Sequence, residues 1–314
     1  MPKLVSIVIP AYNCGEFIAE TLESVLNQTY PRFEIIVVDD GSTDSTEGIV
    51  RGYVEKHPEK VVYYRQENGG AAKTRNVGLS HAKGEYIAFL DGDDIFFPEK
   101  LEKTIAFLEQ YHNYALVYTD MFLIDDEGHF LKHWLESKKY FDQGHIFINL
   151  LKECFFIPSS VVIRKEILDQ VGGFDENIRY TEDADLWLRI AKHHQIGLIK
   201  EPLVKWRIHQ GNTSKDIKSG TENMIKVFEK QFFSSDINAE AKKILRKRLA
   251  EKYFDLGYHG YRISDYRWAK DLFLKSFLFR PYWKTGVYGV ISFFFFCFAK
   301  VQSKEIYYGK GVGQ

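Results

Sequence analysis

The chain has 314 residues, of which 45% are hydrophobic and 27% are charged, and its 42 basic and 43 acidic side chains give a formal net charge of −1. This composition excludes a disordered tail, a collagen-like fibre and a small disulfide scaffold, and the length allows about two domains. The near-neutral balance argues against nucleic acid as a partner, because phosphate binding requires an excess of Lys and Arg. Three dispersed cysteines without a CxxC pair indicate a reducing compartment.

Up to about residue 120, short β-rich runs alternate with segments that place apolar residues at helical spacing. This alternation predicts an α/β fold with a doubly wound, mostly parallel sheet, in which ligands bind at the carboxyl ends of the strands. The predicted strands are Leu4–Ile9, Glu34–Val38, Val61–Tyr64, Tyr86–Leu90 and Leu116–Thr119. The predicted helices are Gly15–Gln28, Thr43–His57, Ala71–Ala82 and Pro98–His112.

Beyond residue 120 the pattern becomes mixed. Met121–Ile124 and His129–Leu131 flank a turn and predict a hairpin. Two more strands are predicted at Val161–Arg164 and Gly197–Ile199, with the helix Glu182–His194 between them.

After residue 220 only helical spacing remains, and the Asn-, Thr-, Ser- and Lys-rich stretch 212–220 predicts a domain boundary near residue 218. The expected organisation is an α/β domain over residues 1–218 and a helical C-terminal extension over residues 219–314.

An apolar run of fourteen residues, 286–299, lies in this extension. Because a membrane-spanning helix needs roughly 20 apolar residues, three placements stay open: on a membrane surface, packed on the protein, or in a shallow insertion or span. Basic residues around the run favour anionic headgroups and predict peripheral membrane contact through residues 284–304. We therefore expect a cytoplasmic protein that is in contact with the cytoplasmic face of the membrane.

Two acidic motifs follow predicted strands. Asp39 and Asp40 are placed to accept hydrogen bonds from a base or a ribose, although capping of the next helix by Ser42 or Asp44 is an alternative reading. The second motif, Asp91-Gly92-Asp93-Asp94, clusters carboxylates that repel one another unless a cation lies among them. Oxygen ligands favour Mg²⁺ or Mn²⁺. A solvated acidic turn is the alternative.

Two further motifs precede predicted helices. The glycine turn in Asn68 to Asn76 leads into a helix with two cations in its first turns, which suits a diphosphate as well as a plain turn. In Thr181-Glu182-Asp183, a carboxylate at a helix start suits either a general base or simple capping.

These motifs, in this order, resemble the family 2 glycosyltransferases, which have the GT-A fold and invert the anomeric carbon. The resemblance covers about residues 3–215. Its matching segments are Pro10-Ala11-Tyr12-Asn13, Asp39-Asp40-Gly41-Ser42, Asn68 to Asn76, Gly84-Glu85-Tyr86, Asp91-Gly92-Asp93-Asp94 and Thr181-Glu182-Asp183.

The resemblance implies a nucleotide-sugar site, with Tyr12 stacked on the base and Asp40 on its imide edge. The implied donor-binding residues are Pro10, Tyr12, Asp39, Asp40, Asn68, Gly70, Lys73, Arg75, Asp91 and Arg207.

It also implies a metal site and a catalytic base. Mg²⁺ or Mn²⁺ would be held by Asp93, Asp91 and His209, although His209 fits a lone surface histidine as well. Asp183 would be the base, positioned by Glu182.

The function implied is metal-dependent, inverting transfer from a UDP-sugar to a hydroxyl of a lipid-linked glycan or cell-surface polysaccharide precursor. The Gln-x-x-Arg-Trp element of processive synthases is absent, which indicates one sugar per encounter. Alternatives are a haloacid dehalogenase-type phosphatase, a nucleotidyltransferase and a sugar-nucleotide-binding protein without catalysis.

Overall fold

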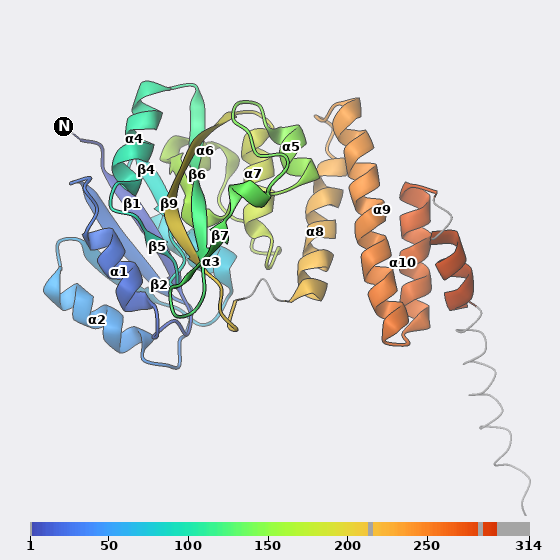
Figure 1. Cartoon of the computed structure of the whole chain (residues 1–314), viewed down its shortest axis with the longest axis horizontal. Helices are drawn as coiled ribbons and strands as arrows, with labels where there is room; N and C mark the ends of the chain where they lie inside the picture. The colour runs from blue at the N-terminus through green and yellow to red at the C-terminus, as the bar shows by residue number, and fades with distance from the viewer. Residues whose placement is uncertain (1, 213–215, 282–284, 294–314) are drawn as a thin grey trace, which may run out of the picture. The chain divides into compact units, whose positions relative to one another are not determined.

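The computed structural model describes residues 2–212, 216–281 and 285–293 (Figure 1). The chain divides into two compact units, Met1–Thr213 and Ser214–Gln314. The first is an α/β unit, and the described part of the second is helical, which confirms the predicted fold class.

One mixed sheet runs through the α/β unit. Within the described residues it has nine strands in the order β3-β2-β1-β4-β8-β6-β9-β5, with β7 paired to β6. The strands are β1 (Val5–Ala11), β2 (Phe33–Asp39), β3 (Val61–Arg65), β4 (Tyr86–Phe89), β5 (Ile95–Phe96), β6 (Tyr114–Ile124), β7 (Phe130–His133), β8 (Val161–Arg164) and β9 (Gln195–Arg207).

Strand direction decides which loops share an edge of the sheet. β1 runs parallel to β2 and β4, whereas β8 runs antiparallel to both β4 and β6. β6 and its parallel partner β9 therefore run in the same direction as β4. The carboxyl ends of β1, β2, β4 and β9 consequently meet at one edge, where ligands bind in sheets of this kind.

Helices cover both faces of the sheet because side chains alternate along each strand. Val5, Ile7 and Ile9 of β1 belong to the core cluster that contains the apolar faces of α1, α2 and α4. On the other face, Val8 lies against Gly78 of α3, where an added Cβ would come within 2.3 Å of the valine. The helices of this unit are α1 (Ile18–Leu26), α2 (Thr46–Lys56), α3 (Ala71–His81), α4 (Lys100–Gln110), α5 (Phe147–Lys152), α6 (Lys165–Val171) and α7 (Glu182–Ala191).

The predicted elements recur with three differences. The strands expected at Leu116–Thr119 and Met121–Ile124 are one continuous strand, β6, because the intervening Asp120 is buried and accepts hydrogen bonds from Met121 N and Leu135 N. β9 extends far beyond Gly197–Ile199. The short elements β5, α5 and α6 were not predicted, because each is too short to show a periodic pattern of apolar residues.

The helical unit contains α8 (Ile217–Phe232), α9 (Ala239–Arg262), α10 (Tyr266–Phe279) and a helical segment at 285–293. Asn238 and Asp265 cap α9 and α10 by accepting from backbone N–H groups at 2.8 and 3.1 Å. α9 and α10 pack closely where Gly257 faces Phe273.

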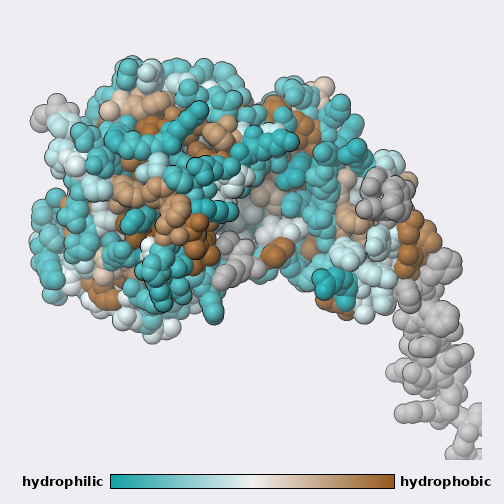
Figure 2. Space-filling view, in the orientation of Figure 1, coloured by the Kyte–Doolittle hydropathy of each residue, from teal (hydrophilic) through white to brown (hydrophobic). Residues whose placement is uncertain are grey.

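Apolar side chains are exposed on the last helices of this unit, and Figure 2 shows such patches at its surface. They include Leu274, Phe277 and Leu278 of α10 and, at three-residue spacing, Val287, Val290 and Phe293. Residues 294–304 of the predicted membrane-contact segment lie outside the described residues. In the part of the chain that is described, no helix combines the length and the apolar character needed to cross a bilayer.

Candidate active site

A cavity of about 320 Å³ lies at the edge where the strands β1, β2 and β4 end. All four predicted motifs contribute to its wall, together with residues at the end of β1 and directly after it. The predicted site residues that line it are Pro10, Tyr12, Asp40, Asn68, Gly70, Arg75, Asp91, Asp93 and Glu182. Tyr12 is 54% exposed and lines the cavity, so its ring is accessible to a ligand there.

Asp39 and Asp40 have different roles because neighbouring side chains of a strand point in opposite directions. Asp39 is fully buried and accepts hydrogen bonds from Ser42 N at 2.7 Å and from the Tyr63 hydroxyl at 2.6 Å. It is not among the cavity-lining residues. Asp40 lines the cavity and organises the glycine turn, since its carboxylate accepts from Gly69 N and Gly70 N, both at 2.8 Å.

The glycine turn brings backbone amides to the cavity. Gly70 has φ +87°, a conformation that residues with a Cβ rarely adopt, and it immediately precedes α3. The side chain of Lys73 is packed over Gly69 and is exposed, and it does not line the cavity. Of the two predicted cations in this segment, only Arg75 therefore faces the site.

Arg75 joins two of the acidic motifs. Its guanidinium donates to Glu182 Oε1 at 2.6 Å and to Asp91 Oδ1 at 2.7 Å, and its side chain is only 5% exposed. The two carboxylates raise the pKa of Arg75 above its usual value, against the effect of burial. The Arg75 guanidinium thus links the loop after β4 to the start of α7.

Asp183 lies beside Glu182 in the first turn of α7 and is not among the cavity-lining residues. Burial, followed by repulsion from Glu182, raises the pKa of Asp183 to about 7, while Arg75 lowers it in part. A carboxyl group that titrates near neutrality is suited to accept a proton at physiological pH.

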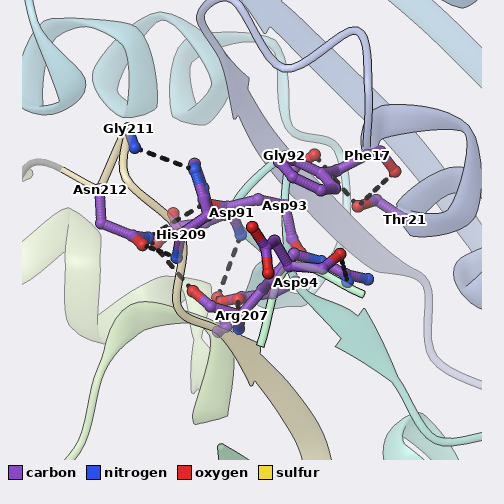
Figure 3. Close-up of polar contacts among 12 residues, drawn as sticks. Phe17, Thr21, Asp91, Gly92, Asp93, Asp94, Arg207, His209, Gly211 and Asn212 are labelled. Carbon is purple, nitrogen blue, oxygen red and sulfur yellow. Dashed lines mark hydrogen bonds and ion pairs between the residues drawn. The ribbon is translucent and has the colours of Figure 1, made fainter. Parts of the chain in front are cut away.

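Asp93 and His209 are in direct contact. His209 Nε2 lies 2.8 Å from Asp93 Oδ2, and the Asn212 amide lies 3.4 Å from the same oxygen (Figure 3). Across the described residues, no group of three or more His, Cys, Asp or Glu side chains is arranged to hold a metal ion. Asp93 lines the cavity, whereas His209 does not and contacts the Asp93 carboxylate from beside it. Because Mg²⁺ sites typically use one or two carboxylates together with substrate phosphates, the Asp93 carboxylate fits a cation shared with a diphosphate. Asp91, the third predicted ligand, is paired with Arg75.

Arg207 is held within the protein at the end of β9 (Figure 3). Its guanidinium donates to the Asp93 carbonyl at 3.1 Å, to the Asp126 carbonyl at 3.0 Å and to the Glu20 carboxylate at 2.5 Å. The ring of Phe17 lies 4.8 Å from both the Arg207 guanidinium and the His209 ring. Arg207 does not line the cavity, and its hydrogen bonds join the loop that carries Asp93 to α1 and to the β6–β7 turn.

One wall of the cavity was not predicted from the sequence. It consists of Glu176, Ile178, Arg179 and Tyr180, which precede α7. Asn76 of α3 holds this wall in place, since its side chain donates to the Phe174 carbonyl and accepts from Phe174 N at 2.9 and 2.8 Å. The Gly172-Gly173 pair marks the loop in the sequence, but nothing local indicates which side chains face the ligand.

Comparison with known proteins identifies the family. Residues 6–172, more than half of the chain, match glycosyl transferase family 2. The chain belongs to this family. Membership rules out the phosphatase and nucleotidyltransferase alternatives and confirms the predicted resemblance.

Two relatives illustrate the range of the family 2 match. An uncharacterized glycosyltransferase of Rickettsia typhi is 35% identical over 218 residues, which cover 67% of this chain and 66% of that protein. The minor teichoic acid biosynthesis protein GgaB of Bacillus subtilis is 32% identical over 215 residues, covering 67% of this chain and 23% of that protein. The match thus spans at most about two thirds of the length of either relative.

Two solved structures share the fold of this family 2 chain. TarS of S. aureus in complex with UDP-GlcNAc has a TM-score of 0.66 at 23% identity, covering 87% of this chain and 81% of that chain. The mannosyltransferase PcManGT from Pyrobaculum calidifontis in complex with GDP-Man and Mn²⁺ has a TM-score of 0.62 at 19% identity, covering 94% of this chain and 86% of that chain. These likenesses establish the GT-A-like fold.

Proposed function

We propose that this chain transfers a sugar from a UDP-sugar, with inversion of the anomeric carbon, to a hydroxyl of a cell-envelope glycan or lipid-linked precursor. The observation that carries the proposal is the convergence of Asp40, Asp91, Asp93 and Glu182 on one cavity, with Asp183 next to it. The UDP-GlcNAc in the TarS structure and the name of GgaB support the donor and acceptor classes.

In this proposal the donor lies between the ring of Tyr12 and the glycine turn. Tyr12 stacks on the base, which its exposed ring permits. Asp40 acts chiefly by holding Gly69 and Gly70, because both of its oxygens already accept hydrogen bonds from that turn. The amides at the start of α3 then face the anionic part of the donor, as helix N-termini do in many phosphate sites.

Asp183 performs the proton transfer. Its carboxylate accepts the proton of the acceptor hydroxyl while that oxygen forms a bond to the anomeric carbon and the bond to the nucleoside diphosphate breaks. Attack from the face opposite the leaving group inverts the centre. Glu182 is held by Arg75 at 2.6 Å and keeps the first turn of α7 in position for this step.

Asp93 and His209 would hold Mg²⁺ or Mn²⁺ together with the diphosphate. When bound, the cation acts as a Lewis acid that offsets the negative charge of the leaving diphosphate. The complex of PcManGT with Mn²⁺ supports a metal in this fold.

A donor panel tests this function. Thermal unfolding is followed with UDP-GlcNAc, UDP-glucose and GDP-mannose, each with and without Mn²⁺. We expect stabilisation by a UDP-sugar that depends on Mn²⁺. A higher unfolding temperature with GDP-mannose alone would show that the donor carries guanine in place of uracil. An unchanged unfolding temperature with every donor would contradict the proposal.

Turnover is then followed as UDP release with polyol-phosphate and lipid-linked glycan acceptors, and the anomeric configuration of the product is determined by NMR. Retention of configuration would contradict the single displacement. Donor binding without turnover on any acceptor would favour the sugar-nucleotide-binding alternative.

We further propose that the helical unit contacts the membrane surface where such acceptors reside. Leu274 and Leu278 of α10 are 55% and 72% exposed, and the same helix carries exposed Arg267 and Lys275. Exposed apolar and basic side chains on one helix are typical of interfacial contact with anionic lipid.

Sedimentation with phosphatidylglycerol vesicles tests this contact. The full chain should bind these vesicles more strongly than phosphatidylcholine vesicles, and Leu274→Ser combined with Leu278→Ser should weaken binding. Leu131→Ser, at a 51% exposed leucine of β7, is the matched control. Equal binding of phosphatidylglycerol vesicles by the wild type and all variants would contradict membrane contact through α10.

A further inference from the structure

Asp94, the last residue of the acidic motif, has a fully buried side chain. It is not among the residues that line the cavity, in contrast to Asp91 and Asp93. Neither the donor site nor the proton transfer described above uses it. Burying a carboxyl group is costly unless its oxygens are satisfied, so the partners of Asp94 indicate what the residue does.

Asp94 joins three separate parts of the fold. Its Oδ2 accepts from the Ser159 hydroxyl at 2.5 Å, and its Oδ1 accepts from the backbone N–H of Arg207 at 3.0 Å. Ser159 belongs to the short helical turn η2 (Pro158–Ser160), and Arg207 is the last residue of β9. One side chain therefore connects the loop after β4 to η2 and to the segment that leads to His209.

Ser159 extends this connection to the donor side. It is fully buried, and its Oγ also accepts from the backbone N–H of Asp91 at 3.1 Å. The loop is closed by Asp94 N, which donates to the Asp91 carbonyl at 3.0 Å. Both ends of the segment that contains Gly92 and Asp93 are thus held by the same pair of side chains.

The Ser159 turn has a firm anchor of its own. Lys100 of α4 is fully buried and donates from Nζ to the Ser160 carbonyl at 2.5 Å and to Thr119 Oγ1 at 3.3 Å. The turn can therefore serve as a fixed point for the loop.

We infer that Asp94 and Ser159 are positioning residues that fix Asp91 and Asp93, together with the Arg207–Asn212 segment, in the geometry that binds the nucleotide and its cation. Asp94 acts through hydrogen bonds and is not itself a ligand. On the opposite side, Arg207 completes the enclosure of Asp93, because its Nε donates to the Asp93 carbonyl at 3.1 Å. Asp93 is left with its carboxylate facing His209.

The binding test uses the full chain with Mn²⁺ and UDP, and rests on the proposed function. UDP affinity is measured by calorimetry in the presence of Mn²⁺, and Mn²⁺ affinity by electron paramagnetic resonance. Asp94→Ala and Ser159→Ala should each weaken binding roughly 10- to 100-fold, the usual effect of removing a group that orients a metal ligand. Asp94→Asn keeps an acceptor for Arg207 N and should retain most of the affinity.

A double-mutant cycle separates one connected pair from two independent effects. Asp94→Ala combined with Ser159→Ala should cost little more than the worse single change, because either one breaks the same connection. Fully additive losses would overturn the pairing. A loss in Asp94→Asn as large as in Asp94→Ala, while Ser159→Ala keeps wild-type affinity, would show that the charge of Asp94 matters apart from its hydrogen bond to Ser159, and would overturn the positioning role.

Asp120→Ala is the matched control, since Asp120 is a buried carboxylate of the same unit that accepts from Met121 N and Leu135 N instead. It should lower the unfolding temperature without changing UDP or Mn²⁺ affinity. If Asp94→Ala fails to fold, Ser159→Ala, which removes a single oxygen, carries the test.

Hydrogen exchange makes the inference independent of the metal. Ser159→Ala should increase exchange at the backbone amides of Asp91 and Arg207, whereas Asp120→Ala should not. If the wild-type chain bound neither UDP nor Mn²⁺, the proposed function would fail, and the exchange experiment would still decide the positioning role. Unchanged exchange at both amides in Ser159→Ala would overturn it.

Discussion

Arg75 donates a hydrogen bond to Glu182 at 2.6 Å, although the two residues are 107 positions apart in the chain. This contact joins α3 to α7 and, through the second bond of Arg75 to Asp91, brings the nucleotide side of the cavity next to the proposed base. Most of the predictions below concern residues on either side of this contact.

Replacing Arg75 should destabilise the protein strongly. Arg75→Met keeps much of the side-chain volume but leaves the buried Glu182 without its cation, and breaking a buried pair costs about 3–5 kcal/mol. Arg51→Met is the control, because Arg51 is 60% exposed in its pair with Glu47 and such pairs contribute about 1 kcal/mol or less. Urea unfolding measures both changes, and equal costs would contradict the structural role of Arg75.

Asp183→Asn should abolish sugar transfer while donor binding persists. The amide cannot accept the proton of the acceptor hydroxyl, yet Asp183 does not line the donor cavity. Asp185→Asn, two positions along α7 in a pair with Arg189, is the control and should lower stability without abolishing transfer. Transfer at the wild-type rate by Asp183→Asn would make the base assignment wrong.

The rate of transfer should rise with pH through the neutral range. A base must be ionised to act, and burial raises the pKa of Asp183 to about 7. We therefore expect kcat/KM to increase between pH 6 and pH 8 and to level off above. A pH profile that is flat through this range would show that another group accepts the proton.

Ionisation of Asp183 should also affect the stability of the fold, but here the effect of rising pH is unfavourable. Since the pKa of Asp183 is higher in the folded than in the unfolded chain, where it is near 3.8, ionisation is disfavoured on folding. The penalty is absent below pH 4, grows as the pH rises and is complete above about 7. Asp183→Asn should thus raise the unfolding temperature relative to the wild type at pH 8 and have little effect at pH 4.

Asp93→Ala and His209→Ala should both increase the Mn²⁺ concentration needed for half-maximal transfer. His209 Nε2 lies 2.8 Å from Asp93 Oδ2, and each substitution removes one of these two proposed ligands of the cation. Mn²⁺ titrations at saturating donor measure the change. His129→Ala, at a histidine with a 70% exposed side chain in the β6–β7 turn, is the control. An unchanged Mn²⁺ requirement in His209→Ala would indicate that His209 only contacts Asp93.

The sequence was sufficient to predict the parallel strands and the meeting of the acidic motifs. The predicted strands Leu4–Ile9 and Glu34–Val38 are apolar enough to indicate buried strands, and the residues after them share an edge if the strands are parallel. Asp40, Asp91 and Glu182 accordingly reach one cavity.

The directions of individual side chains could not be predicted from the sequence. Asp39 and Asp40 are adjacent, and only the position of the strand end decides which one faces the ligand. Arg207 is similar, because a long guanidinium side chain can reach the cavity or the protein interior from the same backbone position. Three separate segments supply its partners, so only the assembled fold shows that it holds the Asp93 loop.

Trp187 gives the active site a built-in optical reporter. Its indole is fully buried one turn after Asp183 and packs against Phe89, Phe156 and Phe174. Among the tryptophans that the structure describes, it alone is shielded from water. Its fluorescence should therefore be blue-shifted, and movement of α7 during a catalytic cycle would appear as a change in emission without any attached dye.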